Sequence, residues 1–241
     1  SWLDEKIKSA DGTIWVMPIF EKGPPAILHI VQDKLCGPGH DVGFAKIAKT
    51  IAEKAGRPGP DERIFNPGFV SFISIGGTDW SSRAAAVMNT LAMSRMWKVI
   101  DNQVFQWAKS LVLDDERVKK IHQIGVNIAK AAADKDNAKY QSEDGVCPNC
   151  HSRNFWLRED GIAECEVCAI RGSIKFENNR YVFEFDQKEY EHAHNLLPGK
   201  MIHIDDVGKA EMLLAQQKET PEFKNRKEKY RAFIAPSKPE K

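Results

Sequence analysis

Hydrophobic and polar residues follow two periods along this chain, and two short apolar runs set its organisation. Residues 13–17 and 69–75 are mostly apolar and rich in β-branched side chains, which is typical of strands buried in a parallel sheet. Each run ends in a loop, and a segment with helical spacing follows, so we predict helices over residues 26–35 and 82–93. This repeated order of strand, loop and helix predicts a doubly wound α/β domain, which binds ligands outside the carboxyl ends of its strands.

The same criteria predict further elements in the first 135 residues. Residues 2–9, 43–55 and 116–133 have apolar positions at helical spacing, and residues 98–100 form a short third strand. Residues 56–68 are rich in Gly and Pro and predict a loop.

The second half of the chain changes character after a polar stretch at residues 135–145. Short runs with strand-like patterning predict β-hairpins, at residues 154–157, 162–164, 173–176 and 181–185. A Leu-Pro-Gly turn at 197–199, a helix near 207–217 and a charged, Lys-rich tail follow; we expect the tail to wrap a neighbour or to be partly disordered. We predict an α/β domain over 1–139, a small β module over 140–185 and a partly helical extension over 186–241.

Two pairs of cysteines in the predicted β module indicate a metal site. Cys147 and Cys150 form one CxxC turn, Cys165 and Cys168 form another, and 14 residues lie between the pairs. This spacing suits tetrahedral S₄ coordination and resembles a zinc ribbon. Iron in a rubredoxin-like site and two disulfides are the alternatives. His151 and Ala169 occupy the positions where rubredoxins usually carry Gly, which favours zinc.

The size of the module supports a structural metal. About 45 residues are too few to fold stably without one. The fifth cysteine, Cys36, has no CxxC partner and is expected to be a buried or helix-end thiol.

Composition narrows the protein class. The chain has 241 residues, 42% hydrophobic content and a net charge of +1, which argues against nucleic-acid binding over its whole surface. It contains no apolar run of membrane-spanning length and no secretory signal, so we expect a cytoplasmic protein without membrane partners.

Several short motifs, taken in order, resemble the NAD(P)H-dependent FMN reductase family. The segment ADGTIWVMPIF at residues 10–20, with Pro24, the Ile-Leu pair at 27–28 and Asp33, is similar to one segment of that family. The SIGG turn at 74–77 and the helix segment 121–129 are similar to two more. The family has a flavodoxin-like fold and includes multimeric flavodoxin-type quinone reductases and iron–sulfur flavoproteins; the resemblance covers roughly residues 1–135.

The resemblance implies that FMN lies at the carboxyl edge of the sheet, held by three loops. Two of these loops correspond to segments of this chain, and their residues are Pro18, Ile19, Phe20, Glu21, Lys22 and Gly23 in one and Gly76, Gly77, Thr78, Asp79 and Trp80 in the other. The third, a phosphate-binding turn after the first strand of the family fold, has no counterpart, because the sequence begins inside the fold at Ser1. We therefore expect a fragment, or a second polypeptide that supplies the missing half.

Individual roles in these loops remain open between flavin contact and packing. Gly76 and Gly77 would let the backbone approach the flavin closely, or form a plain strand-to-helix turn. Phe20 and Trp80 would wall the isoalloxazine ring or pack elsewhere. Asp79 is expected to cap the helix that follows, and no catalytic residue is assigned.

The resemblance implies an oxidoreductase that passes hydride from NADH or NADPH to FMN and then to a quinone, a small aromatic acceptor or a partner protein. It also implies homo-oligomers. Two alternatives remain: a rubredoxin-like iron protein that transfers single electrons, and a non-enzymatic zinc-ribbon module that binds protein or nucleic acid. The sequence contains no serine elbow and no phosphate-cradling GxxxxGK[ST] motif.

Histidines near acidic residues support weaker hypotheses. We expect His40 and Asp41 to be structural or to contact another subunit. His192, His194 and His203 offer donors for a second metal, but their spacing favours a hydrogen-bonded loop.

Overall fold

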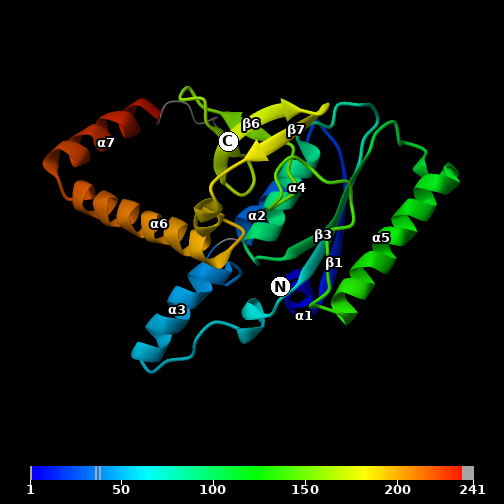
Figure 1. Cartoon of the computed structure of the whole chain (residues 1–241). Helices are drawn as coiled ribbons and strands as arrows, with labels where there is room; N and C mark the ends of the chain where they lie inside the picture. Colours follow the sequence, from blue (N-terminus) through cyan, green and yellow to red (C-terminus); the bar gives the residue numbers. More distant parts are fainter. Residues whose placement is uncertain (1, 36, 38, 235–241) are drawn as a thin grey trace, which may run out of the picture. The chain divides into compact units, whose positions relative to one another are not determined.

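The computed structural model describes residues 2–35, 37 and 39–234 (Figure 1). The chain forms two compact units, Ser1–Lys200 and Met201–Lys241. The predicted boundaries near residues 139 and 185 both fall inside the first unit and stay predictions. The hypothesis about Cys36 lies outside the described residues.

The first half of unit 1 alternates strands and helices as the sequence predicts. Its strands are β1 (Gly12–Pro18), β2 (Phe69–Ile75) and β3 (Lys98–Phe105). Its helices are α1 (Trp2–Ser9), α2 (Ala26–Lys34), α3 (Val42–Lys54), α4 (Ala84–Met93) and α5 (Asp115–Ala133), with short 3₁₀ turns at η1 (Glu62–Phe65) and η2 (Leu111–Leu113).

The three strands form one parallel sheet in the order β1-β2-β3. Strand β2 is central, and helices cover both faces of the sheet: α2 and α4 on one side and α5 on the other (Figure 1). Val70 and Phe72 pack in the core beside α2 and α4, while Phe69 and Ile73 pack on the α5 side. Parallel strands need cover on both faces, which is why β2 is apolar at nearly every position. The predicted parallel α/β fold is confirmed at this level, and it is consistent with a flavodoxin-like or Rossmann-like fold.

Two strand predictions were wrong in detail. The run at residues 13–17 is not fully buried, because β1 is an edge strand and the side chains of Ile14 and Val16 are 42% and 53% exposed. The third strand continues to Phe105 rather than ending near residue 100. Its second half, DNQVF, is more polar than a strand interior, so the sequence pattern hid it.

The β module is a four-stranded antiparallel sheet in the order β4-β5-β6-β7. Its strands are β4 (Phe155–Leu157), β5 (Ala163–Cys165), β6 (Arg171–Glu177) and β7 (Arg180–Glu184). The hydrophobic core of the module includes Ala86 and Met93 of α4. The module is therefore not self-contained, since one face of α4 completes its core.

The last part of the chain is more helical than predicted. After η3 (Gln187–His192), helix α6 runs over Leu197–Lys218 and α7 over Pro221–Ile234. The predicted Leu-Pro-Gly turn is instead the start of α6, a position that tolerates proline because the first helical N–H groups have no intrahelical partner. The charged tail is helical up to Ile234, and its remaining residues lie outside the described part. Within residues 2–234, apart from 36 and 38, no helix combines the length and apolarity needed to span a bilayer.

His40 and Asp41 have separate structural contacts. His40 Nδ1 lies 3.2 Å from Asp4 Oδ1 in α1. Asp41 accepts hydrogen bonds from the first turn of α3, and its Oδ2 lies 2.7 Å from Lys200 Nζ in a buried ion pair. Both residues therefore make contacts within the chain, which fits a structural role, and a contact with another subunit stays a prediction.

Candidate functional site

The loop after β1 is a tight turn built on an unusual backbone. Phe20 and Gly23 exchange backbone hydrogen bonds of 2.8 and 3.0 Å, and the two residues between them, Glu21 and Lys22, have φ values of 47° and 72°. Such left-handed conformations cost about 1 kcal/mol or more in residues other than glycine. Strain of this kind is often found at functional sites.

Backbone hydrogen bonds join the loop after β1 to its neighbours. The N–H of Ile19 donates to the carbonyl of Ile75 at the end of β2, at 2.9 Å, and the N–H of Arg83 donates to the carbonyl of Lys22 at 3.1 Å. The two loops predicted to hold FMN are thus adjacent at the carboxyl edge of the sheet.

The two predicted aromatic residues lie in the loops without being buried. The side chains of Phe20 and Trp80 are 63% and 61% exposed. The ammonium of Lys22 lies 5.5 Å from the centre of the Trp80 ring, a cation–π contact between the two loops. The interpretation of these rings as core residues is excluded, and both are accessible to a planar ligand.

Asp79 does not cap the following helix, contrary to our expectation. Helix α4 begins at Ala84, preceded by Arg83, and has no side-chain cap. The carbonyl of Asp79 instead accepts hydrogen bonds from Ser81 Oγ and Gln106 Nε2, both at 3.2 Å.

Gly76 and Gly77, the glycine pair after β2, lie so close to neighbouring atoms that a side chain at either position would crowd them. A Cβ atom on Gly76 would lie 3.1 Å from the carbonyl oxygen of Thr78 and 3.3 Å from Ile19 Cδ1. A Cβ on Gly77 would lie 2.6 Å from Cε of Lys109, so this lysine chain passes directly over the glycine. The turn thus combines close backbone approach with a nearby cation, which fits an anionic, planar cofactor such as FMN.

A third loop, residues 106–110 after β3, also belongs to this edge, and the sequence reasoning missed it. Predicting β3 to end near residue 100 placed these residues far from the site. The signal that could have found the loop is an aromatic residue shortly after a strand, as Phe20 and Trp80 are after theirs. Here that residue is Trp107, which is 66% exposed.

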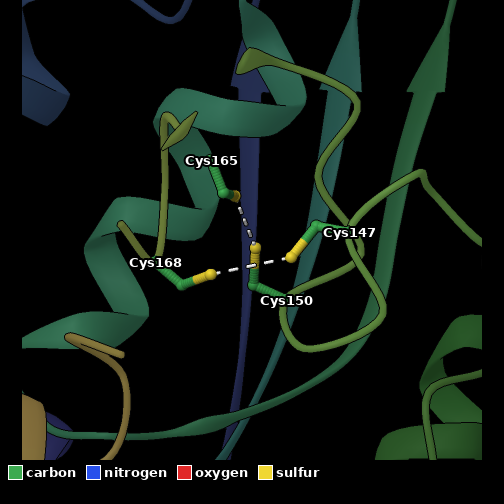
Figure 2. A group of neighbouring side chains, drawn as sticks. All are labelled: Cys147, Cys150, Cys165 and Cys168. Atoms are coloured by element: carbon green, nitrogen blue, oxygen red, sulfur yellow. Dashed lines mark hydrogen bonds between the residues drawn. The ribbon is translucent and has the colours of Figure 1, made fainter. Parts of the chain in front are cut away.

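The four cysteines of the β module come together as predicted (Figure 2). All four sulfur atoms lie within 4.8 Å of one another, with 3.6 Å between Cys147 and Cys168 and 3.4 Å between Cys150 and Cys165. A tetrahedral ion with metal–sulfur bonds of about 2.3 Å needs sulfur atoms about 3.8 Å apart, so the group has the right size. Among the residues that the structure describes, it is the one group found with the make-up of a metal site.

The two CxxC turns have the same backbone design. In each, the residue after the second cysteine donates its N–H to the carbonyl of the first: His151 to Cys147 at 2.9 Å and Ala169 to Cys165 at 3.0 Å. Both of these residues are left-handed, with φ of 59° and 64°. Glycine, which rubredoxins usually carry at these positions, adopts such a conformation without penalty, whereas here His151 and Ala169 adopt it.

Hydrogen bonds between the cysteines change how readily each thiol gives up its proton. The hydrogen bond with Cys150 lowers the pKa of Cys147, and the same contact raises the pKa of Cys150. Thiols this close favour replacement of their protons by a cation.

Helix α4 reaches the cysteine cluster through a buried amide. Asn89, which is 4% exposed, donates from Nδ2 to the carbonyl of Cys150 at 3.1 Å. Its Oδ1 accepts a 2.8 Å hydrogen bond from Asn102 of β3. One side chain thus connects the sheet to a CxxC turn.

A polar cavity of about 410 Å³ lies where α4, β3 and the β module meet. Its lining includes Ser81, Gln106, Tyr140, His151 and Arg153. The rings of Tyr140 and His151 are stacked, with centres 3.9 Å apart, and burial raises the pKa of Tyr140 to about 12. Ser81 and Gln106 connect this cavity to the loops at the carboxyl edge.

Comparisons with known proteins agree with the fold. No family model matches the sequence. A solved structure of a flavone reductase has 45% sequence identity and a TM-score of 0.94, over 99% of this chain and 82% of that one. The chain belongs to the flavone reductase family.

A second relative is more distant. Flavone synthase cfoJ of Aspergillus candidus is 26% identical over 182 residues, which cover 70% of this chain and 54% of cfoJ. The chain thus spans about half the length of this relative. The names of the two relatives, a flavone reductase and a flavone synthase, support an oxidoreductase function.

Proposed function

We propose that this protein is an FMN-dependent oxidoreductase that uses NADH or NADPH to reduce a small planar aromatic acceptor of the flavone type. The observation that carries the proposal is the similarity to flavone reductase along nearly the whole chain. One relative is named for making a flavone and the other for reducing one. A flavone-type ring system is therefore a better candidate than the quinone or partner protein that the sequence alone also allowed.

The loops at the carboxyl edge offer suitable contacts for FMN. When bound, FMN would supply two-electron hydride chemistry between the nicotinamide and the acceptor. Phe20 and Trp80 would contact the faces of its ring system, and Gly76 and Gly77 would let the backbone approach its edge. Lys109, whose side chain crosses Gly77, would place positive charge beside that edge.

The cysteine cluster is proposed to hold zinc in a structural role. Cys147, Cys165 and Cys168 are at most 1% exposed, and they belong to the hydrophobic core that the module shares with α4. A closed, buried S₄ site fits structural zinc, which has no open position for a substrate.

The flavin proposal can be tested with the purified full-length protein. FMN is titrated while its fluorescence is followed, and anaerobic NADPH and then flavone are added while the flavin absorbance is recorded. We expect quenching on binding, bleaching with NADPH and recovery with flavone, with a product two hydrogens heavier. A protein that neither quenches FMN fluorescence nor bleaches with either nicotinamide contradicts the proposal.

Matched variants locate the flavin. Trp80→Ala is expected to weaken FMN binding about tenfold, since a stacked ring contributes about 1 kcal/mol or more. Phe176→Ala is the control, because this aromatic ring is equally exposed, at 62%, but lies in β6 of the module.

The rubredoxin-like alternative keeps one observation in its favour, the left-handed residue after each CxxC pair. Metal analysis and a visible spectrum decide between the two ions. A thiolate–iron band that bleaches on reduction would favour electron transfer by the cluster, and a colourless site with one zinc per chain would favour the structural role.

A further inference from the structure

We infer that Trp107, in the loop after β3, is a substrate-contact residue that stacks on a planar ring of the flavone-type acceptor. This inference rests on the proposed function for the identity of the acceptor. It adds a third loop, residues 106–110, to the two that are proposed to hold FMN.

Hydrogen bonds on both sides of Trp107 fix its loop against the glycine turn after β2. On one side, Gln106 Nε2 donates to Ser81 Oγ at 2.7 Å and to the carbonyl of Asp79 at 3.2 Å. On the other, the N–H of Ala108 donates to the carbonyl of Gly76 at 2.8 Å, and the N–H of Gly76 donates to the carbonyl of Phe105. Trp107 is thus held next to the turn proposed to contact FMN, between two anchored neighbours.

The backbone of Trp107 is strained, and yet its side chain is not packed into the core. Its φ is 52°, a left-handed value that is unusual for a bulky residue, while the side chain is 66% exposed. Arg117 of α5 donates a 3.1 Å hydrogen bond from Nη1 to the Trp107 carbonyl and so holds this conformation. A strained, anchored residue that presents an indole ring to solvent is better explained by a ligand than by packing.

The three strands of the sheet therefore end in the same way. Phe20 follows β1, Trp80 follows β2 and Trp107 follows β3, and each ring is between 61% and 66% exposed. With Phe20 and Trp80 assigned to the flavin, Trp107 is the third of these exposed rings and is assigned to the acceptor. The polar cavity is lined by Ser81 and by Gln106, the residue before Trp107, and it supplies hydroxyl and amide groups that suit a hydroxylated aromatic molecule.

The test is equilibrium dialysis of flavone against the full-length protein, with and without FMN. Trp107→Ala is expected to weaken flavone binding about tenfold, and Trp107→Phe to restore most of it, because stacking needs only a flat ring. FMN affinity and the rate of flavin bleaching by NADPH should change less than about twofold. Trp156→Ala, a tryptophan 61% exposed in β4, and Leu113→Ala, an apolar residue 83% exposed near the same loop, should bind flavone like the unmodified protein.

The outcomes separate the two proposals. If flavone binds and Trp107→Ala binds it equally well, or if the variant loses affinity for NADPH instead, the assignment of Trp107 is wrong. It also fails if the unmodified protein binds no flavone. If flavone binding depends on Trp107 but FMN never binds, the inference stands and the flavin proposal falls.

Discussion

The carboxyl edge of the sheet and the cysteine cluster share a backbone feature but use it for different purposes. Both force residues other than glycine into left-handed conformations, Glu21, Lys22 and Trp107 at the edge and His151 and Ala169 at the cluster. In both regions hydrogen bonds to the backbone hold the turns that contain these residues. At the edge the strained backbone presents aromatic rings to solvent, whereas at the cluster it turns sulfur atoms inward. Strain in the backbone alone therefore does not reveal a role, since the exposure of the side chains separates the proposed ligand-binding loops from the proposed structural metal site.

The largest expected effect is on the cysteine cluster. Cys165→Ser should reduce bound zinc from about one ion per chain to nearly none and lower the melting temperature strongly, because a structural zinc site contributes much of the folding energy of a small module. Metal analysis and thermal unfolding measure both effects. Cys36→Ser, outside the CxxC pairs, should keep the metal, and zinc retained at full occupancy in Cys165→Ser would contradict the assignment.

The connection between the two regions is tested at Asn89. Asn89→Ala should lower the free energy of unfolding by about 2 kcal/mol, because it leaves the partly buried carbonyl of Cys150 and the amide of Asn102 without this partner. Release of zinc to a chelator should become faster as well. Asn154→Ala is the control, since its 3.1 Å hydrogen bond to the Ser82 carbonyl is exposed and should matter by less than about 1 kcal/mol. Equal effects of the two substitutions would show that Asn89 does not connect the regions.

Glycine substitutions compare the strain in the two regions. Ala169→Gly should raise the free energy of unfolding by up to about 1 kcal/mol, because glycine adopts a φ of 64° without penalty. Lys22→Gly removes similar strain but also removes the cation–π contact with Trp80, so we expect a net change near zero. Urea unfolding measures both. A loss of stability in Ala169→Gly would show that the CxxC turn is unstrained.

The smallest expected effect is on how the stability of the fold depends on pH. Burial raises the pKa of Asp101 on β3, although hydrogen bonds from Asn127 and Ser142 oppose the change. The folded protein therefore holds this proton to a higher pH than the unfolded chain does. The stability that comes from the protonated form is complete below the ordinary aspartate pKa of about 4 and is lost as the pH rises through the raised value.

Asp101→Asn should remove this dependence. Urea unfolding from pH 4 to 7 should show a smaller decline in stability for the variant than for the unmodified protein. Parallel curves for the two proteins would mean that Asp101 has an ordinary pKa. The difference between the two curves is the relevant quantity, because the cysteine cluster also responds to acid and contributes equally to both.

Sequence reasoning succeeded where local chemistry is decisive. The CxxC spacing brought Cys147, Cys150, Cys165 and Cys168 together, and the bounds of β2 were predicted to the residue. Sequence reasoning failed where contacts with distant parts of the chain determine the local structure. The polar second half of β3 is a strand because β2 supplies its hydrogen bonds, and Leu197 begins a helix rather than a turn. Asp79 was predicted to cap a helix, but α4 begins later in the chain. The carbonyl of Asp79 instead accepts a hydrogen bond from Gln106.

The sequence by itself determined the parallel α/β order of the first half and the four thiolates of the second, because strand periodicity and CxxC turns are encoded within a few residues. Only the tertiary structure decided that β1 lies at an edge of the sheet and that α4 completes the core of the β module. It also decided that the loop after β3 lies beside the other two loops at the carboxyl edge. Those features depend on contacts between segments far apart in the chain. The sequence placed Phe20 and Trp80 after predicted strands, but only the structure showed that β3 ends just before Trp107 and brought all three rings to one edge of the sheet.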